Sequence, residues 1–394
     1  MHPPNLRSIK RSFYLIAFFN GFFVWYAIDK VFYEQIGMSL QQIIILGALA
    51  WAPQLLFEIP SSVLADKWSR KKVLVISLIL LAASTIIIGL GSTFLVFAIG
   101  ATVWALGTAM YSGTYEALIY DSLKDRGLKE HYQNVKGIAD SLFLWSMTLA
   151  GIVAYLISLF GNLRMAFFFT LPGLLYAIWL VSRMFEPKIT PATHANLSWY
   201  RHLKEVMVIL KSDLLRWLIL LVVVLVAFKS VMYEYYQIFS TSKGLSIESV
   251  ALLFPVILIG MAISSYIFGR FNLTRISTVV AWIGLILSSS IGLIFGGAIA
   301  IFANLFVMYA AIKYIDSYLN LHIQERIESS RRASILSTAN SFGQILFLLL
   351  AVLFYFVVEE LGVSGSIAIS AAPLITLGVV DIVRVTKQRP VITS

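Results

Sequence analysis

The sequence contains no cysteine, although it is 394 residues long. Disulfide bonds, thiolate nucleophiles and cysteine-ligated metal ions are therefore excluded. Charged side chains are also scarce, because they make up only 13% of the residues against about a quarter in an average soluble protein. Hydrophobic residues make up 59%, and the mean hydropathy is +0.86. A water-soluble core of this size could not bury so much apolar surface, so we expect much of it to face lipid.

The sequence also lacks the motifs of the large enzyme classes. It has no Walker loop, no dinucleotide-binding glycine fingerprint, no metal-ligand cluster and no catalytic constellation. We therefore expect a protein that is not an enzyme and that uses no cofactor or metal. The net charge of +10 does not indicate a nucleic-acid partner, because Lys and Arg lie in short clusters between apolar runs, as in membrane loops.

Long apolar runs are what the sequence has instead. A membrane-spanning helix needs roughly 20 apolar residues. Such runs predict six spans in the first half, at 12–34, 40–65, 73–91, 94–121, 137–160 and 163–185, and six in the second, at 213–241, 246–268, 276–296, 299–324, 333–358 and 364–385. The fold class is therefore an all-α membrane protein of twelve transmembrane helices. A linker at 186–212, with a short surface helix around 203–210, is predicted to join two six-helix bundles, 1–185 and 213–394.

The positions of the basic residues predict the orientation in the membrane. If the N-terminus is cytoplasmic, the outer segments hold only Arg164 and Lys243, and Lys30, Lys229 and Lys313 lie within spans. All other Lys and Arg residues then fall on the inner side, as the positive-inside rule requires. We therefore expect a multi-pass protein of the cell membrane whose two termini are both cytoplasmic.

Ionisable side chains within the spans are the most informative feature. Each costs about 2.5–3.5 kcal/mol on insertion scales and so needs a partner, a wet cavity or a function. They recur on the first helix of each group of three spans, a period that inverted repeats around a central aqueous site would produce. With aromatic residues on the same helical faces, they predict a substrate cavity lined by Asp29, Trp25, Tyr115, Lys229, Tyr233, Glu234, Tyr309, Lys313 and Asp316.

Two further acids point to proton coupling. Glu116 in span 4 and Glu58 in span 2 have no oppositely charged neighbour on their own helix. A carboxyl group placed in this way can take up and release a proton near neutral pH. The alternative for the other charges is a set of structural ion pairs, such as Lys229 with Glu234 or Lys313 with Asp316. For the aromatic side chains the alternative is ordinary packing.

The segment between spans 2 and 3 reads Ser62-Val63-Leu64-Ala65-Asp66-Lys67-Trp68-Ser69-Arg70-Lys71-Lys72. It resembles the signature loop of the major facilitator superfamily, although serines at 62 and 69 replace both glycines of the motif. Glu58-Ile59-Pro60 before it and Tyr115-Glu116-Ala117-Leu118 in span 4 also resemble runs found in that family. The resemblance implies a six-plus-six transporter fold in which Asp66 and Arg70, with Lys71 beside them, form a cytoplasmic gate.

These observations predict a proton-coupled carrier that moves a small organic molecule by alternating access. We expect its partners to be the solute, protons and the lipid bilayer, and we expect a monomer. The mixture of aromatic side chains and carboxylates favours efflux of an amphiphilic or drug-like compound. The alternatives are uptake of an organic anion, favoured by Lys229 and Lys313, and a lipid flippase or a non-transporting sensor on the same fold.

Overall fold

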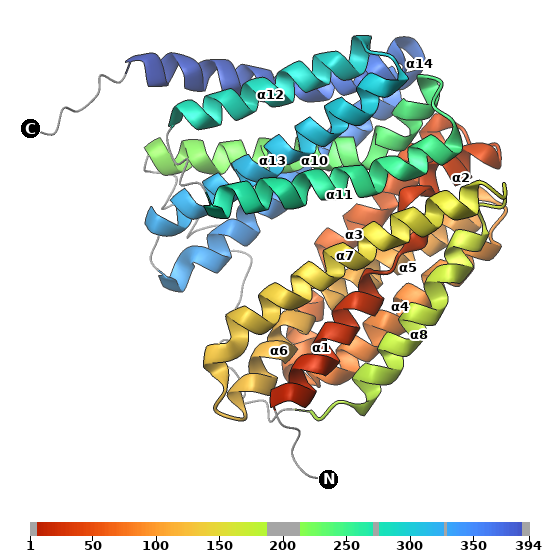
Figure 1. Cartoon of the computed structure of the whole chain (residues 1–394), viewed down its shortest axis with the longest axis vertical. Helices are drawn as coiled ribbons and strands as arrows, with labels where there is room; N and C mark the ends of the chain where they lie inside the picture. Colours follow the sequence, from red (N-terminus) through yellow and green to blue (C-terminus); the bar gives the residue numbers. More distant parts are fainter. Residues whose placement is uncertain (1–5, 187–212, 271–275, 327–328, 388–394) are drawn as a thin grey trace, which may run out of the picture. The chain divides into compact units, whose positions relative to one another are not determined.

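The computed structural model describes residues 6–186, 213–270, 276–326 and 329–387, and every regular element within these ranges is a helix (Figure 1). In the first part of the chain the elements are α1 (Leu6–Gly21), η1 (Val24–Ala27), α2 (Asp29–Gln35), α3 (Leu40–Lys67), α4 (Arg70–Leu90), α5 (Phe94–Tyr111), α6 (Thr114–Lys124), η2 (Lys129–His131), α7 (Tyr132–Ser158) and α8 (Met165–Arg183). They are followed by α10 (Asp213–Ser242), α11 (Ile247–Arg270), α12 (Ile276–Phe295), α13 (Ala298–Arg326) and α14 (Ser329–Lys387).

These helices follow the predicted spans closely. Predicted spans 1 and 4 are each divided into shorter helices, and spans 11 and 12 run together in α14, where Gly362 has the non-helical angles φ 64° and ψ 179°. Within the described residues, nine helices are long and apolar enough to cross a membrane. Apart from Glu186, the predicted linker and its surface helix lie outside the described residues.

The contacts gather the helices into two compact units. The first comprises Met1–Asn196 and Ser246–Pro255, and the second comprises Leu197–Leu245 and Val256–Ser394. In the first unit α4 packs between α5 and α8, and α1 packs against α7 and α8. In the second unit α10 packs along α14, and α13 packs against α12. The predicted boundaries of two bundles at 185 and 213 remain a prediction.

Span 1 is broken in the middle of the first unit. After α1 ends at Gly21, the chain forms the short 3-10 helix η1 and then α2. A broken helix leaves backbone groups without their usual partners, and a neighbouring helix must satisfy them. Thr170 of α8 does so, because its hydroxyl oxygen accepts a hydrogen bond from the backbone N–H of Val24 at 3.1 Å, and this contact is buried.

Span 4 is broken as well, at Ser112 and Gly113. Gly113 has φ +20° and nothing within 4 Å of where a Cβ would lie, so glycine suits this position because of its backbone conformation. The helix restarts at Thr114, and the backbone N–H of Ala117 bonds to the Gly113 carbonyl at 2.9 Å. Glu116 lies in the first turn of α6, directly after this break.

Small residues bring α4 and α5 close together. The hydroxyls of Ser77 and Ser84 on α4 donate hydrogen bonds to the backbone carbonyls of Gly107 and Gly100 on α5, at 2.9 and 2.7 Å. A Cβ added to Gly107 would lie 2.8 Å from a methyl carbon of Leu81. Close approach through small residues with interhelical hydrogen bonds is how membrane helices associate without a hydrophobic driving force.

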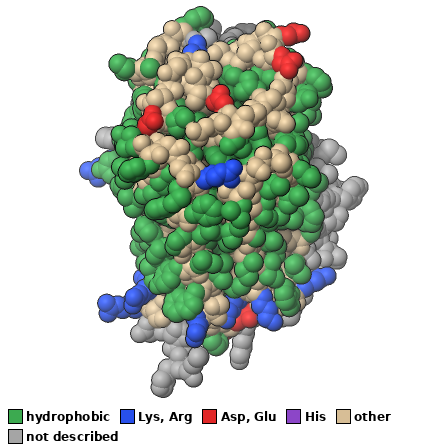
Figure 2. Space-filling view, turned by 90° about the vertical axis from the view of Figure 1, so that its right-hand side faces the viewer, with side chains coloured by type: hydrophobic (Ala, Val, Ile, Leu, Met, Phe, Trp, Pro, Cys, Tyr) green, Lys and Arg blue, Asp and Glu red, His purple; other side chains and the backbone are tan. Residues whose placement is uncertain are grey.

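The surface carries the apolar side chains that the composition requires. Figure 2 shows a face whose middle is mostly hydrophobic and near whose lower edge Lys and Arg side chains gather. Large apolar side chains such as Phe160, Ile299 and Phe295 are more than four-fifths exposed. In water these residues would be a liability, but they suit a lipid environment.

Candidate functional site

The clearest polar cluster of the first unit joins α6 to α7. The ammonium group of Lys136 lies 3.0 Å from the carboxylate of Glu116 and 2.7 Å from that of Asp140. The side chains are exposed to 27%, 54% and 56% for Lys136, Glu116 and Asp140, so the cluster is open rather than sealed. One ammonium between two carboxylates leaves one negative charge uncompensated within the group.

Tyrosines lie within electrostatic reach of this cluster, and an asparagine contacts one of them. Tyr111 hydrogen-bonds with the side chain of Asn20 and lies within electrostatic reach of Asp140 and Glu116. Tyr111 also stacks on Tyr115, with ring centroids 5.2 Å apart. Tyr132, in the first turn of α7, also lies within electrostatic reach of Glu116, Lys136 and Asp140. Tyrosines of α5, α6 and α7 thus lie within electrostatic reach of the charged groups.

Tyr115 was predicted to line the cavity, and the structure gives it a different set of contacts. Its ring is buried, and its hydroxyl donates a hydrogen bond to the backbone carbonyl of Phe13 on α1 at 2.8 Å. The Phe13 ring meets it edge-on at 5.9 Å. Tyr115 therefore holds α6 against α1, and Tyr111 covers its face.

Asp29, Lys30 and Trp25 lie on the broken part of span 1. Asp29 and Lys30 form an ion pair at 3.0 Å, and both are buried. Trp25 is only 4% exposed and packs edge-on against Trp104 at 4.9 Å and face-on against Phe167 at 5.5 Å. Packing accounts for most of its surface.

Glu58 takes no part in the ion pairs of the Glu116 cluster. Its side chain is half-buried on α3, and its backbone carbonyl accepts a hydrogen bond from Ser61 at 3.0 Å. No ion pair within the described part of the chain includes Glu58. The two predicted coupling acids therefore do not form one hydrogen-bonded group in the structure.

The loop between α3 and α4 is fixed by hydrogen bonds to other helices. Arg70 forms an ion pair with Asp121 on α6 and donates to the backbone carbonyl of Ala117 at 3.2 Å. Ser69 accepts a hydrogen bond from the backbone N–H of Lys72 at 3.0 Å and donates one to the carboxylate of Glu186. Arg70 and Ser69 therefore tie the start of α4 to α6 and to the chain after α8.

Of the other two predicted gate residues, the structure describes the side chain of Lys71 alone. Lys71 is half-buried in the first turn of α4. Asp66 belongs to α3, but its side chain is outside the described residues, so the predicted pairing of Asp66 with Arg70 stays a prediction.

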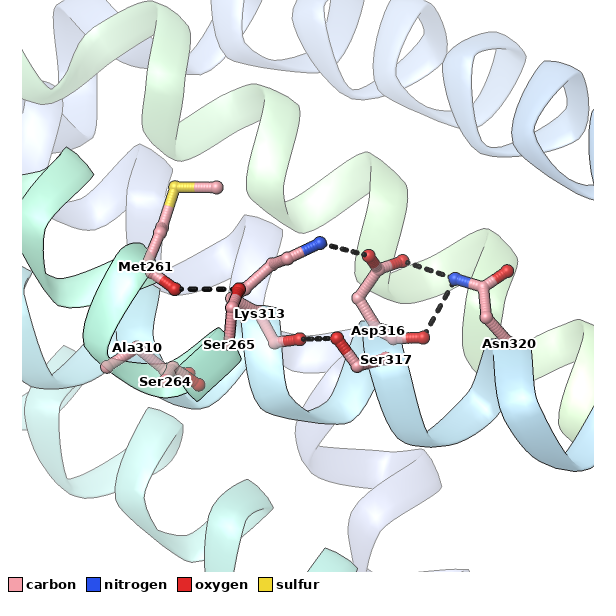
Figure 3. A network of polar contacts seen from close by, with 8 residues as sticks. All are labelled: Met261, Ser264, Ser265, Ala310, Lys313, Asp316, Ser317 and Asn320. Atoms are coloured by element: carbon pink, nitrogen blue, oxygen red, sulfur yellow. Dashed lines mark hydrogen bonds and ion pairs between the residues drawn. The ribbon is translucent and has the colours of Figure 1, made fainter. Parts of the chain in front are cut away.

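In the second unit Lys313, Asp316 and Asn320 form a polar network along one face of α13, as Figure 3 shows. Lys313 lies 3.4 Å from the carboxylate of Asp316. The side-chain amide of Asn320 donates to the same carboxylate at 3.1 Å and to the Asp316 backbone carbonyl at 2.8 Å. Lys313 and Asp316 are about a third exposed, so this polar network is partly accessible to solvent. The ion pair considered as an alternative for these two residues is thus present.

Tyr309 lies one turn before Lys313 and is 1% exposed. Its hydroxyl has no hydrogen-bond partner among the described residues, and Tyr233 and Glu234 of α10 are its electrostatic neighbours. Glu234 is buried, whereas Lys229 and Tyr233 are half-buried. No described ion pair joins Lys229 to Glu234. The second unit therefore concentrates its predicted site residues where α10 meets α13.

Sequence reasoning missed the partners of Glu116. It placed Lys136 in a loop, because span 5 was expected to begin at residue 137, whereas α7 begins at Tyr132. The spacing of Lys136 and Asp140 at i and i+4 is a helical signal that would have found the pair. Asn20, an isolated amide within an apolar run, was a second available signal.

A sequence model described as Major Facilitator Superfamily matches residues 12–351 of the chain. The chain belongs to the major facilitator superfamily. The predicted family is therefore confirmed, and with it a multi-pass membrane protein of the secondary-transporter class that is not an enzyme.

Among known proteins of this superfamily, an uncharacterized MFS-type transporter, YxaM of Bacillus subtilis (strain 168), is 24% identical over 248 residues, which are 61% of this chain and 59% of that protein. The nucleoside transporter NupG has a TM-score of 0.75 at 13% identity, with 97% of this chain and 100% of that chain covered. A D-xylose–proton symporter has a TM-score of 0.72 at 13% identity, with 96% and 97% covered. At such identities the likeness to solved structures shows the fold alone, and it confirms the predicted twelve-helix superfamily fold.

Proposed function

We propose that the chain carries a small organic solute across the cell membrane by alternating access, driven by protons, with efflux of an amphiphilic compound as the preferred direction. The observation that supports it most is the contact of Glu116 with Lys136 across α6 and α7. Protonation of Glu116 removes one of the two charges that hold Lys136, which then stays with Asp140 alone. The electrostatic tie between α6 and α7 thus depends on a single proton.

Proton coupling needs this tie to differ between states of the carrier. A proton can shift a conformational equilibrium only through an interaction that changes between the conformations. Glu116 lies one turn after the Gly113 break, so a change at that break alters its distance to α7. Glu58 is proposed as a second carboxyl that loads protons, on the evidence that it is half-buried and unpaired among the described ion pairs.

The test is flux into proteoliposomes over a panel of radiolabelled organic cations, neutral amphiphiles and anions, with and without a pH gradient. We expect gradient-driven flux of at least one amphiphile, which Glu116→Gln abolishes and Glu58→Gln weakens. Glu34→Gln is the matched control, because Glu34 is an exposed carboxylate elsewhere in the first unit. Gradient-driven flux that persists in both Glu116→Gln and Glu58→Gln contradicts the assignment.

The proposed orientation places both termini in the cytoplasm, and the lack of cysteine makes it easy to test. Lys124→Cys lies at the end of α6, and Lys243→Cys lies between α10 and α11. In intact cells a membrane-impermeant maleimide should label the cysteine at 243 and spare the one at 124. The reverse pattern would show that the chain is inverted.

Uptake of an organic anion is the second candidate, and Lys229 is the observation that favours it. Lys229 is half-buried on α10 and belongs to none of the described ion pairs, whereas Lys313 already faces Asp316. If Lys229→Ala and Lys313→Ala together remove binding of anions only, uptake of an anion is supported. Binding of a solute without any flux would instead support a sensor on the same fold, and flux of a lipid alone would support a flippase.

A further inference from the structure

The cluster of Glu116, Lys136 and Asp140 has the composition of a site for an organic ammonium group. Lys136 places one ammonium nitrogen 3.0 and 2.7 Å from two carboxylates, which are the distances of charge-assisted hydrogen bonds. The side chain of Lys136 is thus a primary alkylammonium bound within the chain itself. Any external primary amine offers the same charge and the same three donors.

The charge balance allows one ammonium group to replace another. Two carboxylates and one ammonium carry a net negative charge, so the replacement of Lys136 by an incoming ammonium costs no charge at the carboxylates. The three side chains are between a quarter and somewhat over a half exposed, and ion pairs as open as these contribute little to stability. Lys136 is therefore held weakly enough to exchange with an external ammonium group.

The neighbours of the cluster supply a second, independent indication. Asn20 is 3% exposed, its side chain bonds to Tyr111, and its Oδ1 atom has no hydrogen-bond partner among the described residues. Tyr111 thus links this buried acceptor to the acidic pair, since Tyr111 itself lies within electrostatic reach of Glu116 and Asp140, and a free acceptor of this kind suits the N–H of a bound cation. Tyr111 and Tyr132 add aromatic rings, whose faces attract organic cations.

We propose that the ammonium group of an organic amine takes the place of the Lys136 ammonium between Glu116 and Asp140, with Tyr111 and Tyr132 against its apolar part. This inference rests on the proposed transport function and names its substrate class as organic amines. Lys136 then acts as an internal counter-ion, which occupies the two acids while the carrier is empty and gives them up to the substrate.

Removal of the internal competitor tests the proposal directly. A tethered group competes at an effective concentration of about millimolar. Lys136→Ala in the full-length purified protein should therefore raise the affinity for 2-phenylethylammonium about three- to fivefold, measured by titration calorimetry. The neutral analogue 2-phenylethanol should gain no affinity. Lys124→Ala removes an exposed lysine of α6 outside the cluster and should leave both affinities unchanged.

The two acids provide the decisive controls. Glu116→Gln with Asp140→Asn, added to Lys136→Ala, should abolish the gain. If Lys136→Ala does not fold, the same acid pair of substitutions in the chain with Lys136 intact should remove the preference for 2-phenylethylammonium over 2-phenylethanol. A gain that is equal for the alcohol, or a preference that survives loss of both acids, overturns the proposal.

These binding measurements use no gradient, so they can fail independently of the transport proposal. Proton-driven flux of a neutral or anionic solute without ammonium selectivity would reject only the substrate class. Ammonium-selective binding without flux would reject only the transport function.

Discussion

The hydroxyl of Tyr115 on α6 lies 2.8 Å from the backbone carbonyl oxygen of Phe13 on α1. This hydrogen bond joins the segment after the span 4 break to the segment before the span 1 break. It holds the two interrupted helices of the first unit in register beside the Glu116 cluster.

Tyr115→Phe removes that hydrogen bond and keeps the ring. A lost hydrogen bond of this kind costs about 1 kcal/mol, which corresponds to a decrease of about 2 °C in the unfolding midpoint. Thermal unfolding of the purified protein at a fixed scan rate measures it. Tyr176→Phe, on the exposed side of α8, is the control and should leave the midpoint unchanged.

Ser69 replaces a glycine of the superfamily loop, and its side chain now caps α4. Ser69→Ala should lower stability by about 1 kcal/mol, because it removes the side chain that caps the helix. Ser69→Gly should cost only a few tenths of a kcal/mol, because glycine is itself well tolerated at the N-cap. The same thermal unfolding measurement separates the two variants. If both variants cost the same, the hydrogen bond to Glu186 outweighs the cap.

Gly113→Ala places a side chain at φ +20° in the break of span 4. We expect a cost of about 1 kcal/mol and a slower rate of solute flux, because the substitution strains the backbone that positions Glu116. Gly284→Ala is the matched control, since Gly284 is within helix α12 and has open space around it. It should be neutral or slightly stabilising. If Gly113→Ala changes neither stability nor flux, the break tolerates a side chain at this position.

The ion pair of Arg70 with Asp121 is about five-sixths buried, so its loss leaves a charge that is poorly solvated. Arg70→Gln and Asp121→Asn should each lower stability by about 2 kcal/mol, and the double variant should cost far less than their sum. A double-mutant cycle on thermal unfolding gives the coupling energy. Strictly additive effects would mean that the two side chains act independently.

Much of the helical layout could be predicted from the sequence, because apolar runs of fixed length are a direct consequence of bilayer thickness. Boundaries marked by charge or glycine were placed within a few residues, such as the start of α3 at Leu40 and of α10 at Asp213. The breaks after Gly21 and at Gly113 were not predicted. Such breaks depend on partners far along the chain, such as Thr170 for Val24, which a local pattern does not contain.

The candidate site was predictable in its residue types and less so in its pairings. The charges of Lys313 and Asp316 were placed on one face because both lie on one helix, and the structure joins them. Lys136 was missed because its partner Glu116 is on another helix, and only the packing of α6 on α7 brings them together.

The contact between Val24 and Thr170 also constrains how the first unit can deform. Because the amide of Val24 depends on a side chain of α8, sliding η1 along α8 would leave a buried donor stranded in a medium without water. Any bending of span 1 during a transport cycle must therefore carry α8 with it, or take place on the α1 side of Phe23. A disulfide engineered between η1 and α8 should accordingly leave turnover intact.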